Sequence, residues 1–217
     1  MDLISLLASG AGVTLRIAIA ASVLALLLAI PLGLARRSSK PWIRIPAVIY
    51  IEFFRGTSLM VQLFWLYFVL PTMGIRLDAM TAAIMGISLN YAAYGAEVVR
   101  GALGSVPNGQ SMAAKALGLS PWLELRLVAA PQAMTVFVRP WGNLMIQLLK
   151  ATSLVSLITI ADLTYRAYQY HQLTMQTFQV FGWVMVFYFI LSQCLAKLTN
   201  LLDRHFSRWR VCGVNHE

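Results

Sequence analysis

The chain contains 217 residues, of which 59% are hydrophobic and only 12% are charged, and its mean hydropathy is +0.71. A soluble domain is about half apolar and about a quarter charged, so this composition excludes an ordinary water-soluble protein and predicts an all-α protein that crosses a membrane several times. The formal net charge is +9. No motif of interleaved basic and aromatic residues accompanies this charge, so we expect no nucleic-acid partner.

The first predicted span covers residues 12–35 and is followed directly by the first of three basic clusters. About 20 apolar residues cross ~30 Å of hydrocarbon, so this segment is long enough. Lys and Arg accumulate in cytoplasmic loops, which predicts an N-terminus outside the membrane and all three clusters inside. The clusters are Arg36, Arg37, Lys40 and Arg44; the basic residues of 100–126; and Arg204, Arg208 and Arg210.

The second predicted span, residues 42–70, is interrupted by the polar segment 50–59. Glu52 and Arg55 are three residues apart, so on one helix they can neutralise each other. Gln62 is expected further along the same helix. A short outer loop, residues 71–78, follows this span.

The third predicted span, residues 79–103, carries Asn90, Tyr94 and Glu97 at spacings of four and three, which place them on one helical face. A Glu in a membrane helix costs ~2.5–3.5 kcal/mol on insertion scales, so it normally faces a cavity or a partner. One interpretation is an interfacial ion pair with Arg100. The other is a position in which Glu97 faces a cavity, on the same helical face as Asn90 and Tyr94.

A polar stretch, residues 106–131, separates the third span from the fourth. It contains two short helical pieces, 110–117 and 121–129, and Pro131 is expected to end it. Its small residues allow a partner to approach the helix backbone closely, so we expect a docking loop; an ordinary amphipathic cytoplasmic loop is the alternative. The small residues are Ala113, Ala114, Ala116 and Gly118.

The fourth span is expected to begin near Pro131 or Pro140 and is followed by a polar stretch that contains Lys150 and Asp162. From its position, Asp162 can be an interfacial cap at the outer end of the span. Residues 149–176 are too polar for one clean span, and whether part of them re-enters the membrane stays open.

The fifth span, residues 178–198, ends at the third basic cluster. Tyr165, Tyr168, Tyr170 and His171 precede it and are expected to form an outer aromatic belt. Cys194 and Cys212 are not expected to form a disulfide, because the second lies in a reducing tail. No linker or repeat divides the chain, so residues 1–217 are predicted to be a single domain.

Several enzyme classes are excluded by missing motifs. No glycine loop with a Gly-Lys-Ser/Thr ending occurs, so this chain is not expected to bind or hydrolyse ATP. Three His in total and no credible catalytic set predict a protein that is not an enzyme and holds no metal or cofactor. Energy for uphill transport must then come from another chain.

Four motifs resemble those of a known family. Ala113, Ala114, Gly118 and Pro131 resemble the Glu-Ala-Ala loop of importer-type ABC transporter permeases, with Met112 at the usual Glu position. The other three resemble the subfamily that imports polar amino acids. They are a Tyr-x-Glu-x-x-Arg-Gly-Thr-Pro-Leu element at 50–59, in which Ser58 replaces the Pro, an Ala-Glu-x-x-Arg-Gly element at 96–101, and a Lys-x-Thr-Ser-Leu run at 150–154 followed by an acidic-Leu pair at 162–163.

The resemblance implies a type I (MetI-like) importer fold with five transmembrane helices, the N-terminus outside and the C-terminus cytoplasmic, in a bacterial inner membrane. It implies docking onto an ATPase through Met112, Ala113, Ala114, Lys115, Gly118 and Pro131. It implies a substrate pathway lined by Asn90, Tyr94, Glu97, Lys150, Thr152, Ser153 and Asp162. In this pathway Glu97 would attract the cationic group of the solute, and Asn90 and Tyr94 would supply hydrogen bonds. Asp162 would be a second acid, with Lys150 either its counter-ion or a contact for the substrate carboxylate.

The resemblance also implies partners: two ATPase subunits that hold ATP and Mg, an identical or sister permease, a periplasmic solute-binding protein and membrane lipid. The expected solute is a polar or zwitterionic amino acid, or a compatible solute such as ectoine. Two other classes stay open, an ion-coupled secondary transporter and a non-transporting membrane scaffold or sensor.

Overall fold

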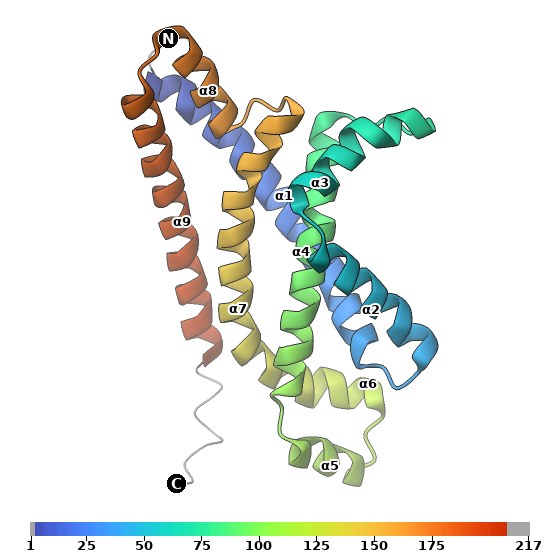
Figure 1. Cartoon of the computed structure of the whole chain (residues 1–217). Coiled ribbons are helices and arrows are strands. Elements are labelled where there is room, and N and C mark those ends of the chain that lie inside the picture. The colour runs from blue at the N-terminus through green and yellow to red at the C-terminus, as the bar shows by residue number, and fades with distance from the viewer. Residues whose placement is uncertain (1–2, 208–217) are drawn as a thin grey trace.

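The computed structural model describes residues 3–207, and every regular element in this range is a helix (Figure 1). Arg208, Arg210 and Cys212 lie outside the described residues. The elements are α1 (Leu3–Arg37), α2 (Pro41–Gly56), α3 (Leu59–Phe64), the π turn η1 (Trp65–Val69), the 3-10 turn η2 (Leu70–Met73), α4 (Ala79–Gly104), α5 (Asn108–Ala116), α6 (Pro121–Glu124), the π turn η3 (Leu125–Ala129), α7 (Ala130–Ala151), the 3-10 segment η4 (Thr152–Ile158), α8 (Leu163–Thr174) and α9 (Thr177–Ser207).

Two helices in this range are long and apolar enough to cross a membrane alone, Leu3–Arg37 and Thr177–Phe206. Two bent pairs qualify when each is taken as one span: Pro41–Gly56 with Leu59–Met73, bent by 102°, and Pro121–Ile158 with Leu163–Thr174, bent by 52°. The boundaries predicted for the first, third and fifth spans agree with α1, α4 and α9, although α1 and α9 extend further at both ends.

The helix α1 crosses the whole molecule and packs most extensively against α4 (Figure 1). Its buried stripe consists largely of alanine, whereas large side chains such as Ile19 and Leu27 are exposed. Close to its end, Gly33 lies against Val99 and the backbone of Ala96, where a Cβ would come within 2.8 Å. Small residues let membrane helices approach closely, so this stripe explains why α1 and α4 form the centre of the fold.

The second predicted span is not one continuous helix. The helix α2 ends at Gly56, and α3 starts at Leu59 in a different direction. Gln62 therefore lies on α3 and not on the helix that carries Glu52, which corrects the sequence prediction. Pro46 lies inside α2.

The fourth span was expected to begin near Pro131 or Pro140, and α7 begins at Ala130, which agrees with the first alternative. Pro131 lies directly after the π turn η3 within a chain that is helical from Pro121 through Ala151, so it does not end the preceding helical segment, which corrects that prediction. The π turn η3 joins α6 to α7, with the Ala130 N–H donating to the Leu125 carbonyl. The segment 121–151 therefore connects the exposed loop to a span without a break.

The polar region 149–176 forms η4 and then the short helix α8, which packs on the N-terminal part of α1 (Figure 1). Asp162 caps α8: its carboxylate accepts the Tyr165 N–H at 2.8 Å. Gly10 of α1 lies directly against this turn, and a Cβ there would lie 2.8 Å from the Asp162 carbonyl oxygen and 2.9 Å from Leu163 Cα.

Gly10→Ala is expected to destabilise the protein by about 1–3 kcal/mol, because the added methyl group must push α1 and the backbone of α8 apart. Thermal unfolding of the purified protein in detergent measures this effect. Gly12→Ala on the same helix is the matched control, since a Cβ there meets nothing within 4 Å. Equal midpoints for the two variants would contradict the close α1–α8 contact.

The described basic clusters share one end of the molecule. The C-terminal ends of α1, α4 and α9 lie at the bottom of Figure 1 together with α5 and α6, whereas α8 and the loop before α4 lie at the top. At the top, Asp78 caps α4 by accepting the Thr81 N–H at 3.1 Å, and this bond and the one from the Thr81 hydroxyl lower the pKa of Asp78.

Candidate functional site

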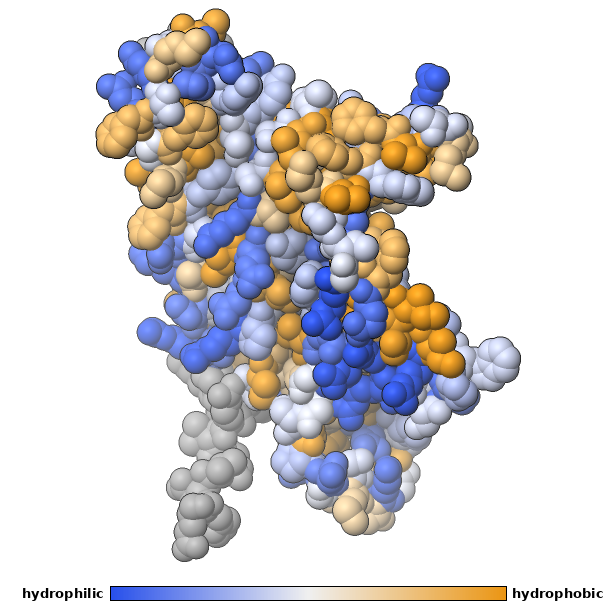
Figure 2. All heavy atoms as spheres, in the orientation of Figure 1, coloured by the Kyte–Doolittle hydropathy of each residue, from blue (hydrophilic) through white to orange (hydrophobic). Residues whose placement is uncertain are grey.

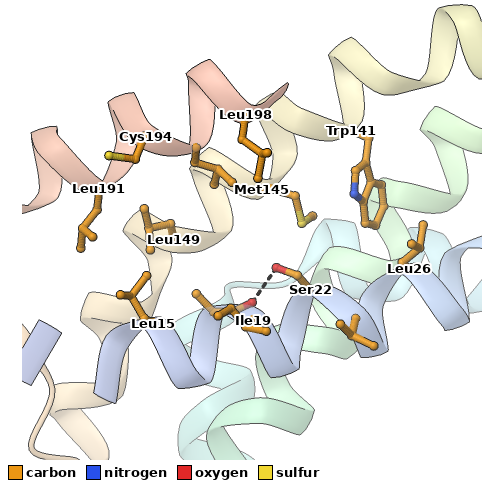
Figure 3. Close-up of a pocket in the computed structure, with 13 residues that line it drawn as sticks. Leu15, Ile19, Ser22, Leu26, Trp141, Met145, Leu149, Leu191, Cys194 and Leu198 are labelled. Atoms are coloured by element: carbon orange, nitrogen blue, oxygen red, sulfur yellow. Dashed lines mark hydrogen bonds between the residues drawn. The ribbon is translucent and has the colours of Figure 1, made fainter. Parts of the chain in front are cut away.

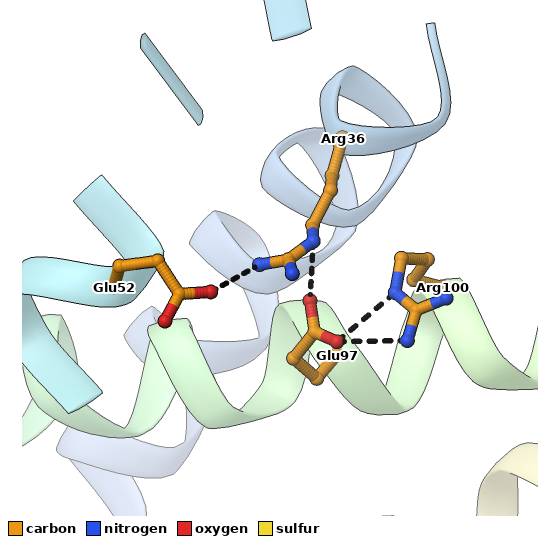
Figure 4. Close-up of polar contacts among 4 residues, drawn as sticks. All are labelled: Arg36, Glu52, Glu97 and Arg100. Carbon is orange, nitrogen blue, oxygen red and sulfur yellow. Dashed lines mark hydrogen bonds and ion pairs between the residues drawn. The ribbon is translucent and has the colours of Figure 1, made fainter. Parts of the chain in front are cut away.

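Three helices bring charged residues together near the basic end of α4 (Figure 4). Glu97 of α4 lies between two arginines: Arg36 Nε of α1 is 2.9 Å from one carboxylate oxygen, and Arg100 Nη2 is 2.9 Å from the other. Arg100 Nε also donates to Glu97 at 3.0 Å, whereas the Arg36 contact is an ion pair without hydrogen-bond alignment. The predicted Glu97–Arg100 pair is confirmed, and Arg36 is an additional partner.

Glu52 of α2 completes this charged cluster. Arg36 Nη1 donates to Glu52 at 3.1 Å, and the Glu52 side chain is 58% exposed. The predicted Glu52–Arg55 pair is therefore wrong, because Arg55 points elsewhere: its guanidinium lies 5.6 Å from the centre of the Tyr94 ring. Glu52 turns toward α1 because Arg36 arrives there from a helix 16 residues earlier, which helical spacing alone does not indicate.

Asn90 is 4% exposed and supports the break between α2 and α3. Its Nδ2 donates to the Phe54 carbonyl at 2.9 Å and to Gln62 Oε1 at 3.1 Å. Gln62 Nε2 donates in turn to Thr57 Oγ1 at 2.6 Å and to the Phe54 carbonyl at 3.2 Å. These bonds satisfy carbonyls that the end of α2 leaves without helical partners, so the Asn90 amide is already engaged within the chain.

Asn90→Leu is expected to destabilise the protein by about 1–3 kcal/mol, because Gln62 Oε1 loses its donor in a buried position. Combined with Gln62→Leu in a double-mutant cycle, the pair is expected to show a coupling of about 0.5–3 kcal/mol in thermal unfolding. A variant that keeps its stability but loses transport would instead place Asn90 in contact with the solute.

The three residues that spacing places on one face of α4 therefore have three different environments. Asn90 is buried against the α2–α3 break, Tyr94 is 36% exposed beneath Arg55, and Glu97 is held by Arg36 and Arg100. Of the three, Tyr94 and Glu97 lie closest to an accessible surface.

Asp162 is fully buried at the opposite end of α1, among hydroxyl groups from four elements. One oxygen caps α8, while the other has no hydrogen-bond partner among the described residues. Nearby, Thr14 of α1 accepts the Leu163 N–H at 3.2 Å, and the hydroxyls of Thr164 and Tyr188 lie 3.1 Å apart. Asp162 therefore acts as the N-cap of α8 and not as an interfacial cap at the end of the fourth span.

Lys150 is exposed and forms no ion pair with Asp162 within residues 3–207, so its predicted role as counter-ion is wrong. The helix α7 ends between the two residues and η4 turns away, which separates them. The Thr152 hydroxyl donates to the Leu149 carbonyl at 2.7 Å and is buried. Ser153 is half-buried on the same 3-10 segment.

The two predicted acids do not form one site in this chain. Glu97 contacts Arg36 and Asp162 contacts Gly10, and these two α1 residues are about 39 Å apart at 1.5 Å per residue. No single small solute spans that distance. The seven predicted pathway residues therefore fall into two groups. The group around Tyr94 and Glu97 lies at the basic end of the molecule and is called the inner group, and the group around Asp162 lies at the opposite end and is called the outer group.

A second exposed region is the helical pair α5–α6, which projects from the basic end of the molecule (Figure 1). Ser120 caps α6, and Gly118 in the connecting turn has a φ of +72°. Ser111 of α5 donates a hydrogen bond to Glu124 of α6, which ties the two pieces together. The two short helices predicted within 106–131 are therefore confirmed.

The exposed surface of this pair is mainly apolar. Met112 is 69% exposed and Leu117 is 79% exposed, and Ala113 and Lys115 are exposed beside them. Ala114, however, is 3% exposed and faces inward, so it cannot touch a partner directly. It instead permits close packing of α5 on the segment that follows.

An apolar cavity between α1, α7 and α9 does not resemble a solute site. It has a volume of about 550 Å³ and is lined almost entirely by aliphatic side chains, with Trp141 at one end (Figure 3). Ser22 is its main polar member and donates to the carbonyl of Ala18 in its own helix. Such a lining offers no fixed polar group for a zwitterion.

Comparison with known proteins decides the family. Residues 21–211 match the model of the family described as "Binding-protein-dependent transport system inner membrane component". This chain belongs to that family. It is an integral inner-membrane protein and the permease subunit of an ABC importer, and the all-helical MetI-like fold predicted from its motifs is confirmed.

The permease is 39% identical to a probable amino-acid ABC transporter permease of Sinorhizobium fredii, over 96% of this chain and 90% of that one. It is 35% identical to the glutamine transport system permease of Escherichia coli, over 93% of each chain. Among solved structures it resembles an amino acid ABC transporter crystallised with histidines, with a TM-score of 0.86, 33% identity, and coverage of 94% and 99%. A methionine ABC transporter at 21% identity shows the same fold, with a TM-score of 0.82 and coverage of 95% and 99%.

Two residues of the permease that shape these sites were not singled out from the sequence. Arg36 was noted only as part of a basic cluster. Thr14 was overlooked, although it follows Ala11 by three residues and precedes Ala18 by four, on the small-residue face of α1. A polar side chain on such a face is a signal for a buried hydrogen bond between helices.

Proposed function

We propose that this permease carries a polar or zwitterionic amino acid across the inner membrane, powered by two ATPase subunits that bind ATP and Mg. The observation that carries the proposal is the α5–α6 pair, whose exposed apolar surface lies at the basic end of the molecule. The amino-acid solutes named for its relatives support this substrate class. Ectoine, a zwitterion of similar size, is the alternative substrate.

We infer five spans: α1, the bent pair α2–α3, α4, α7 and α9. The N-terminus then lies outside and the C-terminus inside, with α5 and α6 in the cytoplasm. The positive-inside rule supports this orientation, because the described basic clusters share one end of the molecule. The same proposal includes an identical or sister permease, a periplasmic solute-binding protein and a single-domain chain 1–217.

The connections of the α5–α6 pair support a mechanism of alternating access. Only three residues, 105–107, separate α4 from α5, and α6 continues into α7 as unbroken helix. A movement of the bound ATPases is therefore transmitted directly through the α5–α6 pair to α4 and α7. ATP-driven closure of the ATPases shifts the permease between inward-open and outward-open states. The free energy of this shift cannot exceed the difference between the binding free energies of the ATPases for the two states.

The proposed solute contacts are the inner group, Tyr94 and Glu97, and the outer group, Asp162 with Lys150, Thr152 and Ser153. The carboxylates suit the ammonium group of an amino acid, and Lys150 suits its carboxylate. Because the two groups are far apart, a solute would meet them in sequence and not together. Asn90 lies on α4 with Tyr94 and Glu97 and is counted in the inner group. Its proposed role is to hold the α2–α3 break through its hydrogen bonds to Phe54 and Gln62.

The proposal is tested by co-purifying the permease with candidate ATPases and reconstituting the complex with its binding protein in vesicles. ATP-dependent uptake of an amino acid is the expected result. Uptake driven by an ion gradient without any ATPase would identify a secondary transporter. ATPase binding without uptake of any solute, tested with glutamine, histidine and ectoine, would identify a scaffold or sensor.

A further inference from the structure

A basic cavity lies at the corner between α1 and α2, next to the ion pairs of Glu97. It has a volume of about 610 Å³ and opens beside the end of α4. Its lining residues are Arg36, Arg37, Arg44, Val48, Arg100 and Gly104. Four guanidinium groups around one cavity form a site for an anion, because arginine binds phosphate oxygens in a bidentate manner.

The charges of this corner are not balanced within the described part of the chain. Arg36 and Arg100 are paired with Glu97 and Glu52, but Arg37 and Arg44 are exposed and form no ion pair among residues 3–207. Lys40, in the turn between the helices, is also exposed and adds a further positive charge nearby. The corner therefore lacks a counter-ion.

An apolar groove adjoins the basic cavity along α2. It has a volume of about 360 Å³, shares Arg44 and Val48 with the cavity, and is otherwise lined by residues that include Ile45 and Ile49. Ile45 is 56% exposed, Ile49 is 63% exposed and Trp42 is 89% exposed. Figure 2 shows hydrophobic surface directly beside hydrophilic surface along this helix.

We propose that this corner binds an anionic phospholipid, with the phosphate headgroup in the arginine cavity and an acyl chain along Ile45 and Ile49. The proposal rests on the orientation given above, in which the corner lies at the cytoplasmic leaflet. Clusters of Lys and Arg directly after a membrane helix attract anionic lipids, and basic pockets between membrane helices bind their headgroups. A soluble phosphate has no apolar part that could occupy the adjoining groove, so a lipid is the favoured source of the anion.

The position of the corner gives the lipid a structural role. Arg36 and Arg100 line the cavity and also hold Glu97 in ion pairs. A bound phosphate neutralises the excess charge on this corner while the Glu97 pairs remain intact. The lipid therefore stabilises the junction of α1, α2 and α4 next to the inner pathway group.

The test is lipid binding to the purified permease–ATPase complex in detergent, measured by native mass spectrometry with phosphatidylglycerol and with phosphatidylcholine of the same acyl chains. Phosphatidylglycerol is expected to bind more tightly. Arg44→Gln is expected to weaken that binding about fivefold, and Arg37→Gln with Arg44→Gln about 25-fold, from the contribution of each basic residue near an anionic surface. Arg44→Lys keeps the charge and is expected to retain most of the affinity.

Arg76→Gln is the matched control, because Arg76 is an exposed arginine in the outer loop and is expected to leave lipid binding unchanged. Unchanged phosphatidylglycerol binding in the double variant overturns the proposal, as does equal binding of the two lipids. Displacement of the lipid by millimolar inorganic phosphate assigns the cavity to a soluble anion. Lipid binding by the permease alone that disappears in the complex assigns the corner to the ATPase. These readouts do not require transport, so they stand apart from the test of the proposed function.

Discussion

Gly118→Val is expected to abolish ATP-dependent uptake and to reduce co-purification of the ATPases. Gly118 has a φ of +72°, a conformation that costs an L-residue roughly 1–2 kcal/mol and is a genuine outlier for a β-branched one. A Cβ at this position meets nothing within 4 Å in the chain, so a side chain would project into the space of a docked partner. Vesicle uptake and pull-down of the ATPases measure the two effects.

Two further variants separate the causes of that loss. Gly118→Asn tolerates the left-handed conformation, so it removes the backbone strain but keeps a projecting side chain. Gly109→Ala, on the exposed part of α5 with open space around its Cβ, is the neutral control. Full uptake by Gly118→Val would contradict docking through this turn, and with it the importer mechanism proposed for the α5–α6 pair.

Glu97→Gln is expected to reduce uptake at least tenfold while the ATPases still co-purify. The carboxylate holds Arg36 and Arg100, and a hydrogen bond to a charged group is worth about 1.5–3 kcal/mol, which corresponds to about 10-fold or more. The neutral amide can neither balance both arginines nor attract the ammonium group of a solute. Uptake in vesicles is the measurement, with ATPase binding as the test of assembly.

Two comparisons decide how Glu97 acts. If it only joins helices, Arg36→Gln, which removes the partner on α1, is expected to reduce uptake and thermal stability as much as Glu97→Gln does. If it lines the pathway, Arg36→Gln is expected to be much milder. Glu52→Gln is the matched control, because its carboxylate is 58% exposed and such ion pairs contribute about 0–1 kcal/mol. Unchanged transport by Glu97→Gln would remove Glu97 from the pathway.

Helical spacing correctly predicts that three of the pathway residues lie on α4, but it does not predict what each of them contacts. Asn90, Tyr94 and Glu97 do lie on α4 at helical spacing, but their neighbours differ. Asn90 meets the end of α2, whereas Glu97 meets the end of α1. The spacing of residues along one helix predicts the direction in which a side chain points. It does not predict which other helix packs against that side chain.

The sequence by itself determined the membrane class, the positions of α1, α4 and α9, the two short helices of the exposed loop 106–131 and the gathering of positive charge, because each depends on local composition or on the 3.6-residue period. Only the tertiary structure decided that Glu52 pairs with Arg36, that Gln62 lies beyond a 102° bend, and that Glu97 and Asp162 lie at opposite ends of α1. Those facts depend on how helices distant in the chain cross one another. The crossing is set by many small residues packed along α1, and no single motif records it.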